Sequence, residues 1–369
     1  MTDRHDGPPA LTGEVLSPRQ PAREPHAGIS ETGQALALAR RLARGQPLGD
    51  ELESLLAGPL REAVTAAADY AQAAASPATR AAYHRHWTEF AAWCRKQAAD
   101  PTQLPINPIL VAAYLATLAP THGKSALRSR VAAIVDYQRR RGVPFAAAHP
   151  VIRETLSGIA RHHGKPVRPA AALTSAEVRQ LIATCRDDLA GVRDRALFLT
   201  GLAGGFRRSE LVAMDVAHLR FDGTGVVIHI PRSKGDQKGE GADVTLPRMR
   251  GQDTCPVQAL ETWLRRAGLT RGAVFRNISR HGTVEERLSG AGVRHILLRR
   301  AAMAKLTVHP SERLSPHGLR AGLITEAYLA GAPDEQVAAH SRHGDLKTMR
   351  GYRRRARITA DNPARLLDL

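Results

Sequence analysis

Apolar residues recur at helical spacing through the first half of the chain, and between residues 66 and 164 they predict about four helices. Ser76 before Pro77 and Asn107 before Pro108 are typical helix starts, because the first side chain caps the helix and proline fits its first position. The other two helices are expected in SALRSRVAAIVDYQRRRG and HPVIRETLSGIARHHG. No strand pattern interrupts them, so residues 66–164 are predicted to form a compact helical domain.

The pattern changes after residues 165–173, a basic connector that contains two prolines. Thr174 and Glu177 then form a capping-box sequence that opens a new helix. Residues 218–247 alternate as strands do, in HLRF, VVIHI and ADVTL, and the rest of the chain is expected to be helical. The second domain, residues 174–369, is therefore predicted to be mainly α with a small antiparallel β-sheet.

The two ends of the chain follow different patterns. Residues 1–30 are rich in proline, glycine and charge, which predicts a disordered lead-in. Residues 31–65 show helical periodicity, but nothing in them indicates a role. At the other end, ITADNPARLLDL is predicted to end in a short amphipathic helix, for which docking on a neighbouring protomer is the preferred hypothesis.

The net charge of the chain indicates what kind of partner it binds. The formal net charge is +18, and it is carried by the folded part: residues 1–60 contain 6 Lys or Arg and 8 Asp or Glu, which leaves 47 and 27 for the remainder. Such an excess favours a polyanion, although a high arginine content can also reflect genome composition. We expect exposed basic side chains to contact DNA, and the candidates are Arg80, Arg85, Lys124, Arg128, Arg130, Lys165, Arg168 and Arg208.

Several classes of protein are disfavoured. The chain has neither an apolar run of 18 residues nor an apolar N-terminal stretch, which predicts a cytoplasmic protein without a membrane partner. Its three cysteines are far apart, so neither a disulfide framework nor a zinc site is expected. The GKS in residues 121–126 lacks the preceding glycine of a phosphate-binding loop, and the adjacent His162 and His163 lack metal-ligand spacing. No cofactor or metal is predicted.

Four short segments of the second domain contain residues suited to one chemistry. Each alone has an ordinary interpretation, as a surface ion pair, a solvated lysine or a helix cap. Together they supply arginines, histidines, a loop lysine and a tyrosine that has few apolar neighbours in sequence. The segments are GGFRRSEL with Arg207 and Glu210, PRSKGDQKGEG with Lys234, LSPHGLRAG with His317 and Arg320, and RHGDLKTMRGY with His343 nine residues before Tyr352.

This order of residues resembles the phage integrase family of tyrosine recombinases. In that family the first arginine lies in GxRxSEL, the second box reads HxLRAG or similar, and the last histidine precedes the nucleophilic tyrosine by nine residues; this chain has GFRRSEL, HGLRAG and that same spacing. The resemblance covers roughly residues 66–358. It implies a helical, SAM-like core-binding domain followed by an α+β catalytic domain.

The resemblance also implies a mechanism. Arg207 and Arg320 would neutralise a phosphodiester, since guanidinium stays protonated and offers a planar fork of donors. A phenol has a pKa of about 10 in water, so Tyr352 would need nearby positive charge or a base to attack phosphorus and form a 3′-phosphotyrosyl enzyme. The remaining roles would fall to Lys234 as general acid, His343 as a donor to phosphate, and Glu210 as the group that holds Arg207 or His317.

At the level of assembly, the family resemblance implies a homotetramer on double-stranded DNA with paired recognition sites, exchanging strands through a Holliday junction. Accessory DNA-bending or directionality factors are possible partners. Integration, excision and resolution all fit the sequence. The alternatives are a telomere resolvase or type IB topoisomerase, and a catalytically silent DNA-binding protein of the same fold.

Two positions depart from the family pattern. Members commonly have Leu-Gly-His before the last box, whereas this chain has AHSRH, which offers both His340 and His343. Spacing to the tyrosine favours His343. The loop after the second strand likewise offers Lys234 and Lys238, and we prefer Lys234 because RSK follows the strand directly.

Overall fold

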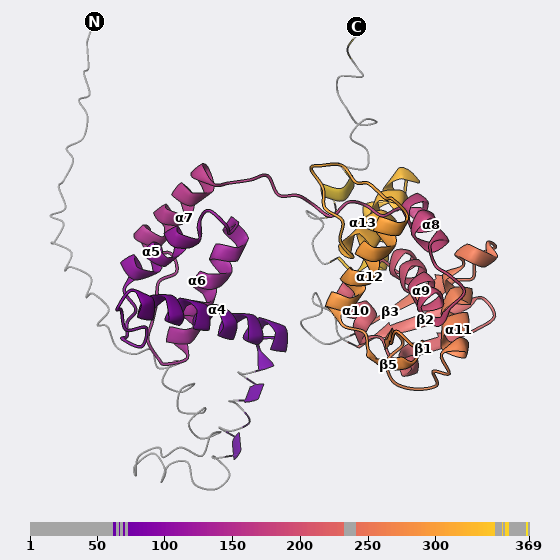
Figure 1. The fold of residues 1–369 in the computed structure, drawn as a ribbon, viewed down its shortest axis with the longest axis horizontal. Coiled ribbons are helices and arrows are strands. Elements are labelled where there is room, and N and C mark those ends of the chain that lie inside the picture. Colours follow the sequence, from indigo (N-terminus) through magenta and orange to yellow (C-terminus); the bar gives the residue numbers. More distant parts are fainter. Residues whose placement is uncertain are drawn as a thin grey trace, which may run out of the picture. The chain divides into compact units, whose positions relative to one another are not determined.

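The computed structural model describes residues 73–231 and 241–343 together with residues 62, 63, 66, 69, 70, 349, 351–353 and 367. The chain divides between Pro166 and Val167 into two compact units (Figure 1). The predicted lead-in, most of the helical segment 31–65, the loop with Lys234 and Lys238, and the predicted C-terminal helix lie outside the described residues. In the part that is described, no helix is long and apolar enough to cross a membrane.

The first unit contains the four predicted helices, α4 (Pro77–Lys96), α5 (Pro108–Leu118), α6 (Lys124–Arg139) and α7 (Pro150–His162). Both predicted caps are present, since Ser76 Oγ accepts from the Thr79 N–H at 3.2 Å and Asn107 Oδ1 accepts from the Ile109 N–H at 2.8 Å. The apolar faces of these helices meet in one core, whose fully buried members include Phe90, Val111, Leu115, Leu127, Ile134 and Ile152.

Arg130 was predicted to be exposed, and that prediction is wrong. The residue is 7% exposed, and its Nη2 donates to Glu89 at 2.9 Å and lies 3.1 Å from His122 Nε2. The helical pattern of α6 places this arginine beside α4, where a carboxylate compensates the cost of burying its charge. Arg130 therefore joins two helices of the first unit.

The second unit is mainly helical with two small antiparallel sheets (Figure 1). Its helices are α8 (Ser175–Ala183), α9 (Leu189–Ala203), α10 (Arg208–Ala213), α11 (Pro256–Arg266), α12 (Gly290–Met303), α13 (His317–Leu329) and α14 (Asp334–Ser341), with short 3₁₀ turns at Val216–His218 and Gln252–Thr254. The capping box of α8 forms as predicted, and the Thr174 N–H donates to Glu177 at 2.8 Å.

The three-stranded sheet matches the predicted strands. Its order is β1 (Leu219–Phe221), β2 (Gly225–Ile230) and β3 (Ala242–Pro247), and both pairings are antiparallel. The residues after β3 are not all helical as predicted, because β4 (Arg276–Ile278) pairs with β5 (Val284–Arg287). Strands of three and four residues are too short to show a reliable alternation in sequence.

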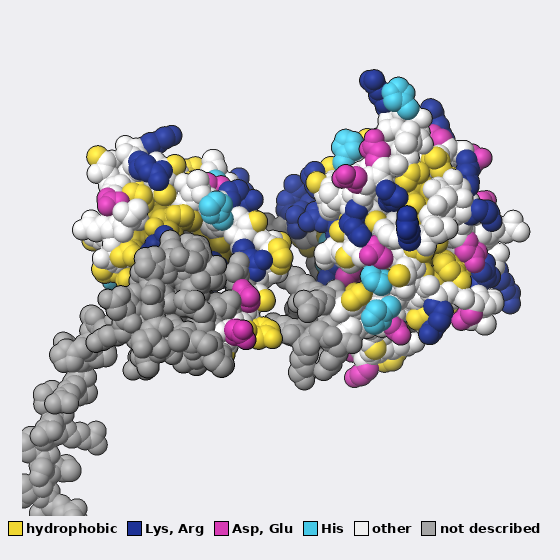
Figure 2. Space-filling model, turned by 90° about the horizontal axis from the view of Figure 1, so that it is seen from below, with side chains coloured by type: hydrophobic (Ala, Val, Ile, Leu, Met, Phe, Trp, Pro, Cys, Tyr) yellow, Lys and Arg dark blue, Asp and Glu magenta, His cyan; other side chains and the backbone are white. Residues whose placement is uncertain are grey.

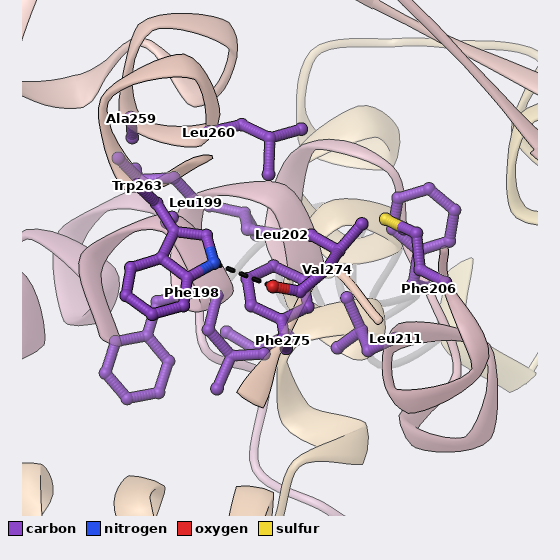
Figure 3. Packing of buried hydrophobic residues seen from close by; sticks show 14 of the residues in the cluster. Phe198, Leu199, Leu202, Phe206, Leu211, Ala259, Leu260, Trp263, Val274 and Phe275 are labelled. Carbon is purple, nitrogen blue, oxygen red and sulfur yellow. Dashed lines mark hydrogen bonds between the residues drawn. The ribbon is translucent and has the colours of Figure 1, made fainter. Parts of the chain in front are cut away.

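The core of the second unit surrounds α9, which contacts α8, α11 and α13. Figure 3 shows Phe198, Leu202, Phe275 and Trp263 in this core. The buried indole Nε1–H of Trp263 donates to the Val274 carbonyl at 2.8 Å, so its polar atom is satisfied where it leaves water. This packing fixes α9, and α9 in turn supports α13 and the turn that leads into α10.

A buried ion cluster also joins three helices of the second unit. Asp194 on α9 is 0% exposed and binds Arg193 at 2.6 Å, Arg300 of α12 at 2.8 Å and Arg299 at 3.0 Å. Arg300 Nη1 also donates to the Thr184 carbonyl at the end of α8, at 2.6 Å. These contacts are separate from the candidate site described below.

Two glycines bring α13 against the segment that enters the second unit. The Gly318 carbonyl accepts from the Leu173 N–H at 2.9 Å, and a side chain at Gly318 would meet the Ala171 carbonyl. At Gly322, a Cβ atom would collide with the Leu173 carbonyl oxygen. Since α13 begins at His317, this close approach sets the position of the His-x-x-Arg motif.

We expect Gly322→Ala to lower the free energy of unfolding of the second unit by about 1–3 kcal/mol, because backbone atoms must move to admit the methyl group. Gly158→Ala is the matched control, since Gly158 lies within α7 and has no atom within 4 Å of its added Cβ. That change should stabilise the first unit by roughly 0.5–1 kcal/mol. Urea unfolding followed by amide hydrogen exchange measures both, and unchanged stability in Gly322→Ala would contradict the close approach.

Candidate active site

The structure brings together the arginine, histidine and tyrosine motifs that the sequence singled out. Arg207 immediately precedes α10, and His317 and Arg320 lie in the first turn of α13. His343 follows α14 after one residue, and Tyr352 lies in a helical segment of which Met349 and residues 351–353 are described. Side chains that are more than 140 residues apart in sequence therefore face one cluster.

Tyr352 is surrounded by apolar side chains in the folded chain, although most of its neighbours in sequence are charged. It is 8% exposed and packs with Ala321, Ile324 and Tyr328 of α13, with Val337 and Ala338 of α14, and with Met349. Its hydroxyl lies 2.9 Å from Nε2 of His317. The ring is thus held by apolar contacts, while its one reactive atom points to a histidine of the same chain.

Arg320 is the most deeply buried charge of the site. It is 0% exposed, Nη1 donates to the Gly205 carbonyl at 2.7 Å, and Nη2 lies 3.1 Å from Nδ1 of His343. Burial, followed by the repulsion of Arg207 and Arg342, lowers the pKa of Arg320 to about 9. The group is still protonated at neutral pH, so it is a cation that a bound anion would stabilise further.

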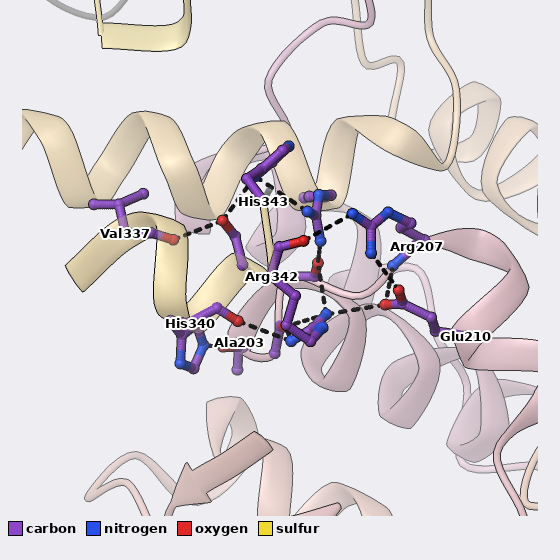
Figure 4. Close-up of polar contacts among 11 residues, drawn as sticks. Ala203, Arg207, Glu210, Val337, His340, Arg342 and His343 are labelled. Atoms are coloured by element: carbon purple, nitrogen blue, oxygen red, sulfur yellow. Dashed lines mark hydrogen bonds and ion pairs between the residues drawn. The ribbon is translucent and has the colours of Figure 1, made fainter. Parts of the chain in front are cut away.

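Glu210 holds two arginines at once (Figure 4). Its Oε1 accepts from Arg207 Nη1 at 2.6 Å, and its Oε2 accepts from Arg342 Nη2 and from the Arg207 backbone N–H, both at 2.9 Å. Burial alone would raise the pKa of this carboxyl, but Arg342 and then Arg207 outweigh burial and lower it. Glu210 is therefore an anion that orients guanidinium groups.

His343 lies between Arg320 and Ser341. A guanidinium N–H only donates, so the contact with Arg320 requires Nδ1 to accept and places the proton of the neutral ring on Nε2. Ser341 Oγ is 2.8 Å from the same Nδ1 and 2.6 Å from the Val337 carbonyl, and its single proton serves one of these acceptors at a time. Burial and then the charge of Arg320 lower the pKa of His343 to about 4.

The geometry separates the two histidines that the sequence offered. His340 Nε2 donates to the Ala203 carbonyl at 2.8 Å, on the side of the cluster away from Arg207 (Figure 4). His343 contacts Arg320 and has its ring centre 6.0 Å from that of Tyr352. Lys234 and Lys238 lie outside the described residues, so the choice between them stays a prediction.

Arg342 is a member of the cluster that the sequence analysis missed. Its side chain is only 9% exposed and is bonded to Glu210. The available signal was the departure from Leu-Gly-His, because a charged side chain directly before the site histidine replaces the family's glycine. The sequence could not show that this side chain turns inward.

The candidate DNA-contacting residues outside the cluster differ in exposure. Lys and Arg side chains are spread over the visible face of the second unit, mixed with acidic side chains and histidines (Figure 2). Arg80 is half-buried and Arg130 is buried. The exposed candidates are Arg85, Lys124, Arg128, Lys165, Arg168 and Arg208, and Arg168 also donates to the Glu312 carbonyl.

A cluster of guanidinium groups near a tyrosine has the charge to bind a phosphodiester beside an attacking oxygen. The Phage integrase family model matches residues 171–357 of the chain, which contain this whole cluster. The chain therefore belongs to the phage integrase family and is a tyrosine recombinase.

Among curated proteins, the integrase/recombinase xerD homolog of Selenomonas ruminantium is 32% identical over 292 residues, which cover 77% of this chain and 83% of that protein. Tyrosine recombinase XerC of Pelotomaculum thermopropionicum is 31% identical over 167 residues, or 44% of this chain and 49% of that one. Over most of its length the chain is thus similar to an Xer-type recombinase.

Solved structures confirm the predicted fold class. The XerH site-specific recombinase, in a post-cleavage complex with its palindromic difH substrate, aligns with a TM-score of 0.57 at 15% identity and covers 94% of this chain and 99% of that one. A lambda integrase dimer bound to a COC′ core site aligns with a TM-score of 0.50 at 16% identity, covering 72% and 70%. At these identities the likeness concerns the fold.

The His343 imidazole should stay neutral down to about pH 4. The ordinary pKa of histidine is 6.5, so between pH 6.5 and about 4 the unfolded chain binds a proton at His343 and the folded chain does not. The free energy of unfolding therefore decreases as the pH falls through this range. A nitrogen-15 NMR titration, with the signal assigned by its loss in His343→Asn, measures this pKa. A midpoint near 6.5 would contradict the burial and the contact with Arg320.

Proposed function

We propose that this protein is a site-specific recombinase that cleaves and rejoins DNA strands through a 3′-phosphotyrosyl intermediate at Tyr352. The observation that carries the proposal is the 2.9 Å contact between Tyr352 Oη and His317 Nε2, next to a guanidinium that is 0% exposed. A purely structural tyrosine would not require a histidine on its hydroxyl and a buried arginine close to it. The family assignment makes DNA the natural source of the phosphodiester.

The arginines would supply most of the electrostatic stabilisation. As the tyrosine oxygen approaches phosphorus, negative charge grows on the two non-bridging oxygens. Arg320, which is preorganised by the Gly205 carbonyl, and Arg207, which is held by Glu210, would donate to these oxygens without reorganising. Their fixed charges support a reaction that needs no metal ion, and His343 would add a neutral donor through Nε2–H.

One cleavage step requires two proton transfers, one from the attacking tyrosine and one to the leaving 5′ oxygen. His317 Nε2 would take the tyrosine proton as the oxygen–phosphorus bond forms. The bond from phosphorus to the 5′ oxygen breaks, and Lys234 would give that oxygen a proton, so a free 5′-hydroxyl leaves. Religation reverses each transfer when another strand's 5′-hydroxyl attacks the phosphotyrosine.

Because one ester replaces another, the intermediate keeps the bond energy, and rejoining needs no nucleotide cofactor. We propose that a homotetramer on two double-stranded recognition sites exchanges one pair of strands and then the other through a Holliday junction. The solved neighbours support DNA as the partner, since XerH was captured with its difH substrate in a post-cleavage complex and lambda integrase as a dimer bound to a core site. Such an enzyme would act in the cytoplasm on the nucleoid, with accessory factors to set direction.

Tyr352→Phe should abolish the covalent adduct with a nicked suicide duplex while leaving the affinity for that duplex within about twofold, because the ring still packs and only the nucleophile is lost. Denaturing gels detect the adduct, and a gel-shift assay measures binding. Tyr328→Phe is the matched control, because Tyr328 lies in the same apolar cluster. Failure of the wild type to form an adduct while binding DNA would indicate a catalytically silent protein.

Lys234→Ala should slow cleavage on the order of 10²–10⁴-fold when the leaving atom is oxygen, which must be protonated as it departs. A substrate with a bridging sulfur at that 5′ position leaves as a thiolate and should largely restore the rate. Lys238→Ala is the matched control and should behave as the wild type with both substrates. If the bridging sulfur rescues Lys238→Ala instead, Lys238 is the general acid. If it rescues neither variant, the general acid is neither of these two lysines.

A further inference from the structure

Arg342 has a backbone conformation that an arginine rarely adopts. It follows α14 with φ of 56° and ψ of 49°, in the left-handed region. A side chain in this region is close to its own carbonyl, which is why glycine is favoured there. A charged residue that is nevertheless placed here, with its side chain 9% exposed, must make contacts that compensate the strain.

Those contacts converge on Arg207 from two directions. The Arg342 carbonyl accepts from Arg207 Nη2 at 2.9 Å, and Arg342 Nη2 donates to the same Glu210 that binds Arg207 Nη1. In this left-handed conformation the Arg342 carbonyl contacts Arg207, while the Arg342 side chain contacts Glu210. A residue in helical conformation would continue α14 instead.

The rest of the Arg342 guanidinium is bound to backbone carbonyls, two in the turn that leads into α10 and one at His340 of α14. It donates to the carbonyls of Gly204 at 3.2 Å, Gly205 at 3.3 Å and His340 at 2.8 Å. It also lies over the ring of Phe206, 5.0 Å from the centroid. The Gly205 carbonyl also accepts from Arg320, so Arg342 and Arg320 share one carbonyl two residues before Arg207.

We propose that Arg342 is a positioning residue for strand cleavage, which holds Glu210 and Arg207 in the orientation that leaves Arg207 directed at the scissile phosphate. This inference rests on the function proposed above. One carboxylate of the described site is shared between two guanidinium groups, with one oxygen for each. Without Arg342, both oxygens of Glu210 could chelate Arg207 and draw it away from the phosphate.

Arg342 also sets the charge that the pocket presents to DNA. Arg207, Arg320 and Arg342 face a single carboxylate in the described part of the site, which leaves two positive charges in surplus before a phosphate enters. Removing Arg342 lowers that surplus by one and leaves Glu210 with one guanidinium partner. Both effects should weaken the binding of the site to the doubly charged transition state of a phosphodiester more than its binding to an uncharged scissile group.

The test compares Arg342→Ala and Arg342→Gly with the wild type on two suicide duplexes. One has a normal scissile phosphodiester, and the other has an uncharged methylphosphonate there. Single-turnover adduct formation on the phosphodiester should fall on the order of 10²-fold in both variants, the loss expected when a reacting group is misplaced by about 1 Å. On the methylphosphonate the loss should be markedly smaller, because less charge has to be stabilised.

The pair of variants separates chemistry from folding. Glycine suits φ of 56° and alanine does not, so Arg342→Gly should have the higher melting temperature while both lose the same activity. Arg342→Lys keeps the charge and should recover part of the rate. Arg300→Ala is the matched control, since it also removes a buried arginine from a carboxylate that keeps other partners, and it should affect both duplexes equally.

Equal losses on the two duplexes, or an activity that follows melting temperature, would reduce Arg342 to a structural residue and overturn the inference. So would cleavage by Arg342→Ala at the rate of the wild type. These outcomes are distinct from a failure of the proposed function, in which the wild type itself would form no adduct at Tyr352.

Discussion

The site depends on keeping positive charge inside a protein. Arg320 has no exposed surface, and this burial, followed by the repulsion of two further guanidinium groups, lowers its pKa to about 9. Such a cluster is unfavourable by itself, because like charges repel and burial removes their water. It is tolerated because Glu210 and backbone carbonyls accept from several of the Nη donors, and the remaining surplus of positive charge is what a phosphodiester would neutralise.

Apolar packing and close backbone contacts in the second unit hold the charged side chains of the site in place. The apolar core around α9 fixes the turn at Gly204 and Gly205, whose carbonyls receive Arg320 and Arg342. The glycines of α13 allow that helix to approach the segment at Leu173, which sets the start of the helix and therefore the position of His317. A smaller apolar cluster then holds the ring of Tyr352 beside that histidine.

Much of this could be read from the sequence, because helix caps, alternating strands and motif spacing are local signals. The four helices of the first unit, the three-stranded sheet and the convergence of Arg207, His317, Arg320, His343 and Tyr352 were all expected. The features that the sequence did not predict depend on non-local contacts or on short segments. Arg130 is buried against Glu89 of α4, β4 and β5 are too short to show alternation, and Arg342 turns inward from a left-handed backbone.

The contact between His317 and Tyr352 joins two residues of one chain, and this has a consequence for how subunits would cooperate. In the assembly proposed above, each subunit would therefore bring its own histidine to its own tyrosine. No side chain would have to pass between subunits before the tyrosine loses its proton.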